Sequence, residues 1–341
     1  MSTSKRKRVY CKQAFLDSFF DVWKGLDPIR DADRIIRFKA TYDMLTIEDV
    51  LLDISRGTGP NDPSDAEIKE IFDKYDWLFM KESPAQCIGD SFPDINLILK
   101  KPTDIKTEIL FSTILTDEDS VDVINFNRRF GIPVLNVSSI DKNLDLFKDS
   151  GTSIIKGINY NSWYSLLKGS DDKYLSNAIL IVDRYIISND RKNNENLFSI
   201  LRSLLPKNVV FPNYQIIICV LDSTSIIDNK TINSISSEIS KISPYLNFTL
   251  TIYSCKSSDF HDRGIVSNNF MIQIGAGFDI IRMGKASMGS DLSIVFPFFY
   301  FDRIRRSAYY RICQEYITMK TEFHRPALGK TDIQDRFLSL I

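Results

Sequence analysis

Short apolar runs alternate with amphipathic segments in the second half of the chain. Nearly continuous apolar runs at residues 178–187, 214–221 and 248–253 predict three buried strands. Between them, apolar residues recur every three or four positions, which predicts helices over residues 195–205 and 232–242. Because strands without polar alternation are buried on both faces, the pattern predicts an α/β fold. We expect a mostly parallel sheet with helices on both faces.

The first half has a less regular pattern. Aromatic residues at helical spacing predict a helix over residues 15–23, and apolar runs predict strands at residues 95–99, 107–115 and 132–137 with a helix over 117–130. We therefore expect an N-terminal helical arm and α/β region of unknown role at residues 1–169. A second domain at 170–305 and a helical tail at 306–341 follow.

Composition excludes several classes of protein. The net charge of -1 gives no overall basic surface for nucleic acid, although a local basic patch remains compatible with it. No apolar run approaches the roughly 20 residues of a membrane span. Five scattered cysteines without a CxxC pair indicate reduced thiols in the cytoplasm and no structural zinc. With only His261 and His324, a multi-histidine metal site is also excluded, and we expect no metal or cofactor.

The most informative segment follows the last predicted parallel strand. Ligands of α/β sheets bind beyond the carboxyl ends of strands, and His261 and Arg263 lie there. A cation beside an imidazole suits a phosphate group. Residues 265–274 predict a short antiparallel pair, and Gly275 and Gly277 would let the backbone approach a ligand. We expect His261, Arg263 and Asn268 to line one concavity whose floor is residues 275–277.

This segment resembles the motif of the phospholipase D superfamily, which reads His, any residue, Lys, four residues, Asp, six residues, Gly-Ser, two residues, Asn. The matching positions are His261, Arg263, Asn268, Gly275-Ala276 and Asp279. The spacing is kept, and four identities differ. His-Asp-Arg, Asn268-Asn269 and the later Gly-x-Gly-x-Asp are also similar to the phospholipase D-like C-terminal domain of MIT-domain-containing proteins. The resemblance covers residues 178–300.

The resemblance implies a module that handles phosphodiesters, most plausibly nucleic acid. In it His261, Arg263, Asn268 and Asp279 would be catalytic, and Arg263, Gly275 and Gly277 would bind phosphate. Active members combine two histidine motifs in a metal-independent reaction, so a nuclease would need a homodimer of this chain. The MIT-associated domains are regarded as non-catalytic and bind acidic membranes. The alternative is therefore a binding module for acidic lipid or a protein partner, and the N-terminal region could be a degenerate first lobe.

Three further patterns are weaker. Asp94, Asp104 and Lys106 match a loose metal-nuclease pattern. A helix at residues 302–311 interleaves arginine with tyrosine, which suits either a phosphate backbone or tyrosines packed inward. The basic residues 5–8 suit a nucleic-acid or membrane contact, or a solubilising tail.

Overall fold

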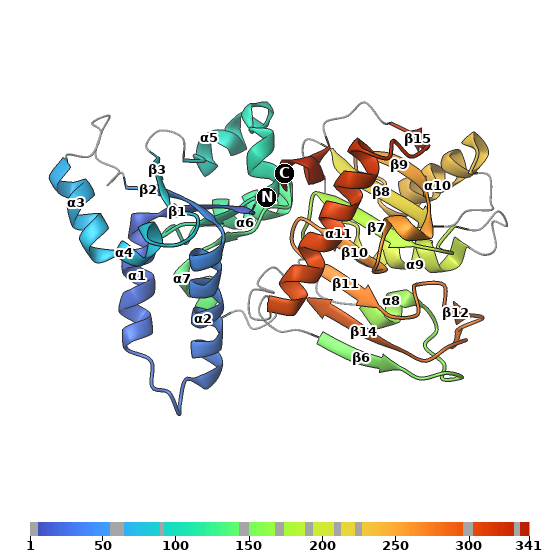
Figure 1. Ribbon diagram of the computed structural model, residues 1–341, viewed down its shortest axis with the longest axis horizontal. Coiled ribbons are helices and arrows are strands. Elements are labelled where there is room, and N and C mark those ends of the chain that lie inside the picture. Colours follow the sequence, from blue (N-terminus) through green and yellow to red (C-terminus); the bar gives the residue numbers. More distant parts are fainter. Residues whose placement is uncertain are drawn as a thin grey trace.

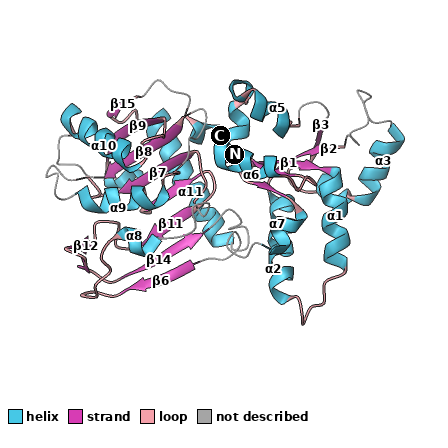
Figure 2. Cartoon of the chain, turned by 180° about the vertical axis from the view of Figure 1, so that it is seen from behind, coloured by secondary structure: helices cyan, strands magenta, loops and turns pink. Residues whose placement is uncertain are grey.

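Two lobes lie side by side in the computed structural model (Figure 1). The structure describes residues 6–54, 65–88, 92–142, 150–167, 174–187, 194–207, 213–221, 227–295, 303–330 and 335–340. Within these residues a five-stranded sheet forms the first lobe, residues 6–142, and an eight-stranded sheet forms the second lobe, residues 150–340. Figure 2 shows the same division from behind. The α/β prediction, with helices on both faces of each sheet, is confirmed.

The first lobe contains a wholly parallel sheet in the order β3-β2-β1-β4-β5. Strand β1 is central, with Val9 and Cys11 facing one apolar cluster and Tyr10 facing the other. Helices α1, α2 and α7 supply the first cluster, and α5 and α6 supply the second. The elements are β1 (Arg8–Lys12), α1 (Gln13–Lys24), α2 (Ala32–Ile47), β2 (Asp49–Asp53), α3 (Asp65–Lys74), α4 (Asp76–Phe79), β3 (Gln86–Ile88), α5 (Ile95–Lys100), β4 (Thr113–Leu115), α6 (Val121–Phe130), β5 (Val134–Leu135) and α7 (Val137–Lys142).

The second lobe contains a mixed sheet in the order β15-β9-β8-β7-β10-β11-β14-β6. Strands β7, β8 and β9 are parallel, and the strands from β10 to β6 are antiparallel to their neighbours. The strands are β6 (Ser150–Ile154), β7 (Ala178–Asp183), β8 (Tyr214–Leu221), β9 (Phe248–Cys255), β10 (Gly264–Ser267), β11 (Met271–Ile274), β12 (Ile281–Arg282), β13 (Lys285–Ala286), β14 (Ser290–Val295) and β15 (Ala327–Gly329). The helices are α8 (Trp163–Leu167), α9 (Glu195–Leu204), α10 (Asn229–Ile242) and α11 (Arg303–Thr321).

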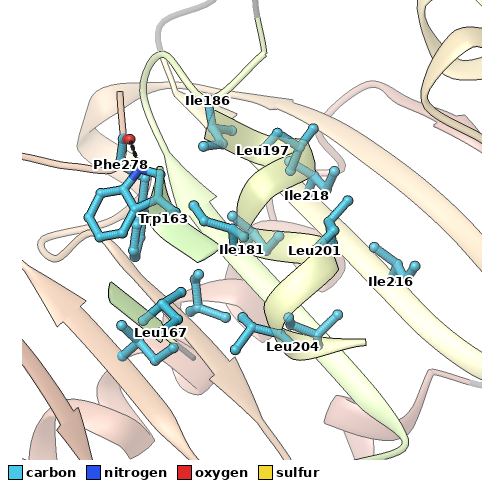
Figure 3. Packing of buried hydrophobic residues seen from close by; sticks show 14 of the residues in the cluster. Trp163, Leu167, Ile181, Ile186, Leu197, Leu201, Leu204, Ile216, Ile218 and Phe278 are labelled. Atoms are coloured by element: carbon cyan, nitrogen blue, oxygen red, sulfur yellow. Dashed lines mark hydrogen bonds between the residues drawn. The ribbon is translucent and has the colours of Figure 1, made fainter. Parts of the chain in front are cut away.

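Strand β7 is buried on both faces of this second sheet. Ile179 and Ile181 belong to the apolar cluster that includes residues of α8, α9 and α10. Figure 3 shows Ile181 between Trp163 of α8 and Leu201 of α9. Leu180 and Val182 pack on the opposite face, against α11. The continuous apolar run that predicted this strand therefore has a packing partner for each side chain.

Some expected elements differ from the observed ones. The strand expected at residues 95–99 is helix α5, because the Asp94 side chain accepts a hydrogen bond from the Leu97 backbone N–H and caps a helical turn. Of the strand expected at residues 107–115, residues Thr107–Phe111 form a 3₁₀ turn and only β4 is extended.

The lobes also divide the chain earlier than expected. Strand β6 pairs with β14, so the second lobe begins by residue 150 and not at residue 170. Residues 168–173, which contain the expected boundary, lie outside the described residues. Helix α11 packs on the second sheet and is not a separate tail. The order β3-β2-β1-β4-β5 of the first lobe is the same as the order β9-β8-β7-β10-β11 within the second. The strand directions differ, because β4 and β5 continue the parallel sheet whereas β10 is antiparallel to β7 and β11 to β10. That the first lobe is a degenerate copy of the second stays a prediction.

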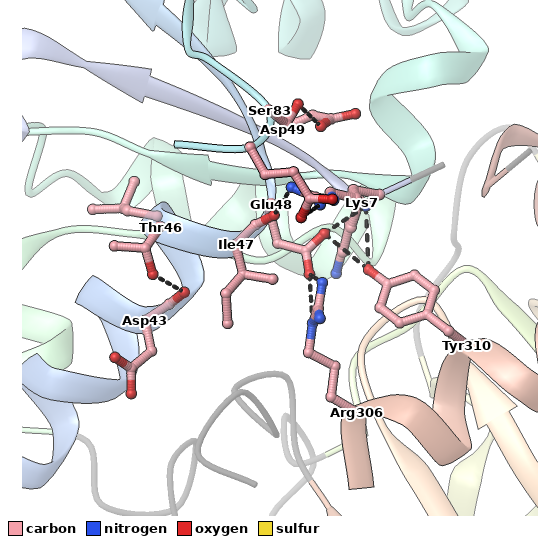
Figure 4. A network of polar contacts seen from close by, with 12 residues as sticks. Lys7, Asp43, Thr46, Ile47, Glu48, Asp49, Ser83, Arg306 and Tyr310 are labelled. Atoms are coloured by element: carbon pink, nitrogen blue, oxygen red, sulfur yellow. Dashed lines mark hydrogen bonds and ion pairs between the residues drawn. The ribbon is translucent and has the colours of Figure 1, made fainter. Parts of the chain in front are cut away.

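A buried carboxylate joins the lobes at the start of β1 (Figure 4). Glu48 of the first lobe is fully buried and accepts hydrogen bonds from the Lys7 backbone N–H at 2.7 Å and the Tyr310 hydroxyl at 2.9 Å. Its other oxygen pairs with the Arg306 guanidinium at 2.8 Å. Lys7 in turn donates from Nζ to the Asn268 carbonyl at 2.8 Å. Lys7 therefore belongs to the interface between the lobes, and the tail interpretation is wrong for it. The tyrosines of α11 pack inward.

Amides and backbone carbonyls complete this interface. The Asn177 side chain donates to the Leu110 and Phe130 carbonyls of the first lobe. The last described residues also lie here, because the Phe337 ring packs 5.1 Å from that of Phe111. Gly131 ends α6 with φ +59, and a Cβ atom there would overlap the Ser176 carbonyl.

Gly131 provides a test of how closely the lobes pack. We expect Gly131→Ala to lower the free energy of unfolding by at least about 2 kcal/mol, because it adds steric overlap to the left-handed strain of about 1 kcal/mol. The matched control is Gly157→Ala, where φ is +82 and no atom lies within 4 Å. Urea denaturation measures both losses, and equal losses would contradict a close fit between Gly131 and Ser176.

Lys7 provides a pH-dependent test of the same interface. Burial lowers the pKa of Lys7 from 10.5 to about 8, against the opposing effect of Glu48. Between these values the unfolded chain binds a proton that the folded protein has released, so folding becomes more favourable as the pH rises. We expect the wild type to gain up to about 3 kcal/mol relative to Lys7→Met between pH 7 and 10.5. Exposed Lys39→Met is the control, and parallel stability curves for wild type and Lys7→Met would contradict the expectation.

Candidate functional site at the carboxyl end of β7

The connections of the second sheet diverge at the carboxyl end of β7. Helices α9 and α10 connect β7 to β8 and β8 to β9 over one face. The chain then returns from β9 to place β10 on the other side of β7. Ligands of open α/β sheets bind at such a switch point. Asp183 ends β7 here, and Arg263 immediately precedes β10.

Asp183 is a buried carboxylate held by backbone groups. Its two oxygens accept hydrogen bonds from the Tyr185 and Phe278 N–H groups, each at 2.8 Å. Burial raises the pKa of Asp183, against the opposing effect of these hydrogen bonds and of the Arg263 charge. The carboxylate thus fixes the loop that follows β11 and faces the Arg263 cation.

The loop that follows β11 passes very close to both side chains. Gly277 has φ +83, and a Cβ atom there would lie 2.6 Å from the Asp183 carboxylate and 3.3 Å from the Arg263 side chain. Glycine is therefore required at residue 277 for contact with Asp183 and Arg263. The expected approach of this backbone to a ligand stays a prediction. Gly275 is exposed beside it, and the Ala276 N–H donates to the Ser290 hydroxyl at 3.0 Å.

Arg263 is a half-buried cation with few partners. Its Nη1 donates to the Ala276 carbonyl at 3.2 Å. In the described part of the chain, this is its one hydrogen bond, and no carboxylate lies within 4 Å to form an ion pair. A guanidinium has five N–H donors, so most of them are available to a ligand.

Two residues that sequence reasoning missed hold the loop in place. The buried Trp163 indole donates to the Phe278 carbonyl at 2.8 Å, and the two rings lie 5.5 Å apart (Figure 3). Asp183 is the other. Its signal was present, because an aspartate at the end of a six-residue apolar strand marks the carboxyl edge of a sheet. Asp279 follows the same loop after β11. Its carboxylate forms an ion pair with Arg282 at 3.0 Å and accepts a hydrogen bond from the Asn196 side chain.

His261 is exposed and held on the α11 side of the sheet. Its backbone N–H donates to the Glu315 carboxylate at 3.2 Å. Burial raises the pKa of Glu315, and the contact with His261 opposes this rise. Arg263 instead donates a hydrogen bond to the loop after β11, which also contacts Asp183. Among the described residues, no hydrogen bond links the His261 imidazole to the Arg263 guanidinium.

Asn268 lies at the opposite end of these strands, near the amino end of β7. Gly264 pairs with Val182 at the carboxyl end of β7, whereas Ser267 pairs with Ile179 at its amino end. The expectation that Asn268 shares a concavity with His261 and Arg263 is therefore wrong. Its amide accepts from the Asn177 N–H at 2.9 Å and donates to the Gly131 carbonyl at 2.7 Å. Asn268 thus joins the lobes.

Two carboxylates of the metal-nuclease pattern lie in separate turns of the first lobe. Asp94 caps α5, and Asp104 lies in the 3₁₀ turn Pro102–Asp104. Throughout the described residues, no three His, Cys, Asp or Glu side chains are placed to hold a metal ion. Nor does any helix of the described chain have the length and apolar character needed to cross a bilayer.

The chain shares structural similarity with proteins of known structure, but no sequence match. Neither the known protein-family models nor the curated protein sequences give a match to this chain. Among solved structures, the phosphatidylserine synthase of Haemophilus influenzae Rd KW20 is similar at 12% sequence identity and a TM-score of 0.28. The match covers 95% of this chain and 82% of that one. At that TM-score the likeness carries no inference about this chain.

Proposed function

We propose that the chain binds the phosphate group of a phosphodiester at the carboxyl end of β7, without cleaving it, and that the ligand is nucleic acid. The observation that carries the proposal is the Arg263 guanidinium, which has one hydrogen bond and no ion pair among the described residues. Arginine in this state binds phosphate oxygens with two parallel N–H donors.

The surroundings of Arg263 support a fixed binding group. The Ala276 carbonyl accepts a hydrogen bond from Arg263 and the loop at Gly277 passes close to its side chain, so little conformational entropy is lost when a ligand binds. Asp183 is buried, and Asp279 is paired with Arg282. The positive charge of Arg263 therefore faces a ligand with limited competition from carboxylates.

Binding without cleavage fits the positions of the other residues better than hydrolysis does. A covalent mechanism through His261 requires the phosphate to contact both His261 and Arg263. His261 is held on the α11 side, and Asn268 lies at the other end of β10. Hydrolysis would also need a carboxylate to orient the His261 imidazole. The residue at the aspartate position of the motif is Asn268, an amide that lies too far along β10 to do so.

Nucleic acid is our choice of ligand over lipid because of the compartment that the cysteines favour. The five cysteines are all free thiols, four of them buried, which supports a reducing compartment such as the cytoplasm. Nucleic acid is the abundant phosphodiester there.

Substitution of Arg263 tests the proposal. We expect Arg263→Gln to weaken binding of a labelled single-stranded oligonucleotide about tenfold or more, because a charge-assisted hydrogen bond contributes about 1.5–3 kcal/mol. His261→Ala should leave the affinity within about twofold. Fluorescence anisotropy at two salt concentrations measures both, and the Arg263 effect should shrink at the higher salt.

The matched control is Arg202→Gln, in the last turn of α9 and away from the carboxyl end of β7. Equal losses from Arg202→Gln and Arg263→Gln would contradict a localised site. Binding of phosphatidylserine vesicles but not of oligonucleotide would show that the phosphodiester is a lipid. Oligonucleotide cleavage in EDTA that is lost in His261→Ala would instead favour a metal-independent nuclease, formed by two copies of the chain.

A further inference from the structure

Two loops at one end of the second lobe expose apolar side chains together. Strands β12 and β13 form a hairpin that projects from the lobe in both views (Figures 1 and 2). The loop after β6 runs beside it, because the Gly157 N–H donates to the Ala286 carbonyl and the Tyr160 N–H to the Gly284 carbonyl. Four apolar side chains of these loops, here called the hairpin patch, are about half exposed or more: Ile155, Ile158, Met283 and Met288.

Met283 has a backbone conformation that residues other than methionine adopt more readily. Arg282 pairs with Lys285, so Met283 and Gly284 form a two-residue turn, with φ +50 and +76. Positive φ at both positions defines a type I′ turn, in which asparagine is strongly preferred at the first position. The Met283 side chain is 100% exposed, so no packing within the fold compensates for the strain. A strained residue without internal packing indicates a role outside the folded chain.

The two loops of the hairpin patch carry basic residues, and carboxylates lie at their margins. Residues 154–162 and 280–290 include Lys156, Arg282 and Lys285, and they are bordered by Asp279 and the exposed Asp291, which accepts a hydrogen bond from the Ser153 hydroxyl. Arg282 pairs with Asp279, but Lys156 and Lys285 are exposed without a carboxylate partner in the described chain. A second copy of the same surface would bring like charges together, so self-association is disfavoured.

We propose that the hairpin patch docks an amphipathic segment of another protein, with an apolar face and acidic flanks. Methionine side chains adapt to varied apolar surfaces, and the two lysines complement acidic flanks. A bilayer fits less well, because the two loops contain no tryptophan, phenylalanine or leucine and fewer than the four to eight basic residues of a lipid-binding cluster. This surface is separate from Arg263.

The test uses the full chain and a fluorescein-labelled helical peptide with leucine on one face and glutamate on the other. We expect saturable binding that weakens at least fivefold in Met283→Asn. The double variant Lys156→Ser with Lys285→Ser should weaken it as much at low salt and less at high salt. The matched control is Met80→Asn, because Met80 is 85% exposed but lies in the first lobe, and its variant should bind like the wild type.

Thermal unfolding separates binding from folding. Asparagine suits the type I′ turn, so the Tm of Met283→Asn should equal or exceed that of the wild type. A lower Tm would show that Met283 stabilises the fold and would overturn the proposal. Peptide binding that is absent, or unchanged by Met283→Asn, would also overturn it. Binding of phosphatidylserine vesicles that depends on Met283, without peptide binding, would replace the protein partner by a membrane.

Discussion

The amide of Asn268 fixes how the two lobes are joined, and the position of the candidate site follows from it. The side chain bonds the start of β7 and the Gly131 carbonyl of the first lobe, while its backbone carbonyl accepts from Lys7. These groups are buried, so each hydrogen bond is made in a region of low dielectric constant, where an unpaired group would be costly. With its amino end joined to the first lobe, β7 leaves its carboxyl end to carry Asp183.

The parallel strands of the second lobe could be predicted from sequence because both of their faces are buried. An apolar run between turn signals has few alternatives when both sheet faces are covered. Strand β8 coincides with its predicted run, β9 extends two residues beyond its run, and β7 ends at Asp183, four residues before the predicted end. The same reasoning was wrong at residues 95–99, where an apolar run of similar composition forms helix α5. There the cap at Asp94 decides the structure, and a single carboxylate outweighs the strand preference of two isoleucines.

The candidate site was only half predictable for a geometric reason. Arg263 and Gly277 were placed correctly near a strand end, and the structure brings them together with Asp183. Asn268 was placed wrongly, because the spacing of a motif gives the number of residues between two positions and not the direction in which the chain runs. Four residues of extended strand cover about 13 Å. This length takes the chain from the carboxyl end of β7 to its amino end. The intervening strand β10 therefore separates Arg263 from Asn268.

The position of Phe337 has a consequence for the order in which the protein is made. This ring is fully buried and completes the apolar cluster between β7 and α11, while contacting Phe111 of the first lobe. It follows Phe111 by 226 residues in the sequence. During synthesis, the contact between the two rings cannot form until residue 337 has left the ribosome. The first lobe can therefore assemble early, but its docking onto the second lobe is completed only then, and until that point part of a hydrophobic surface stays open to chaperones.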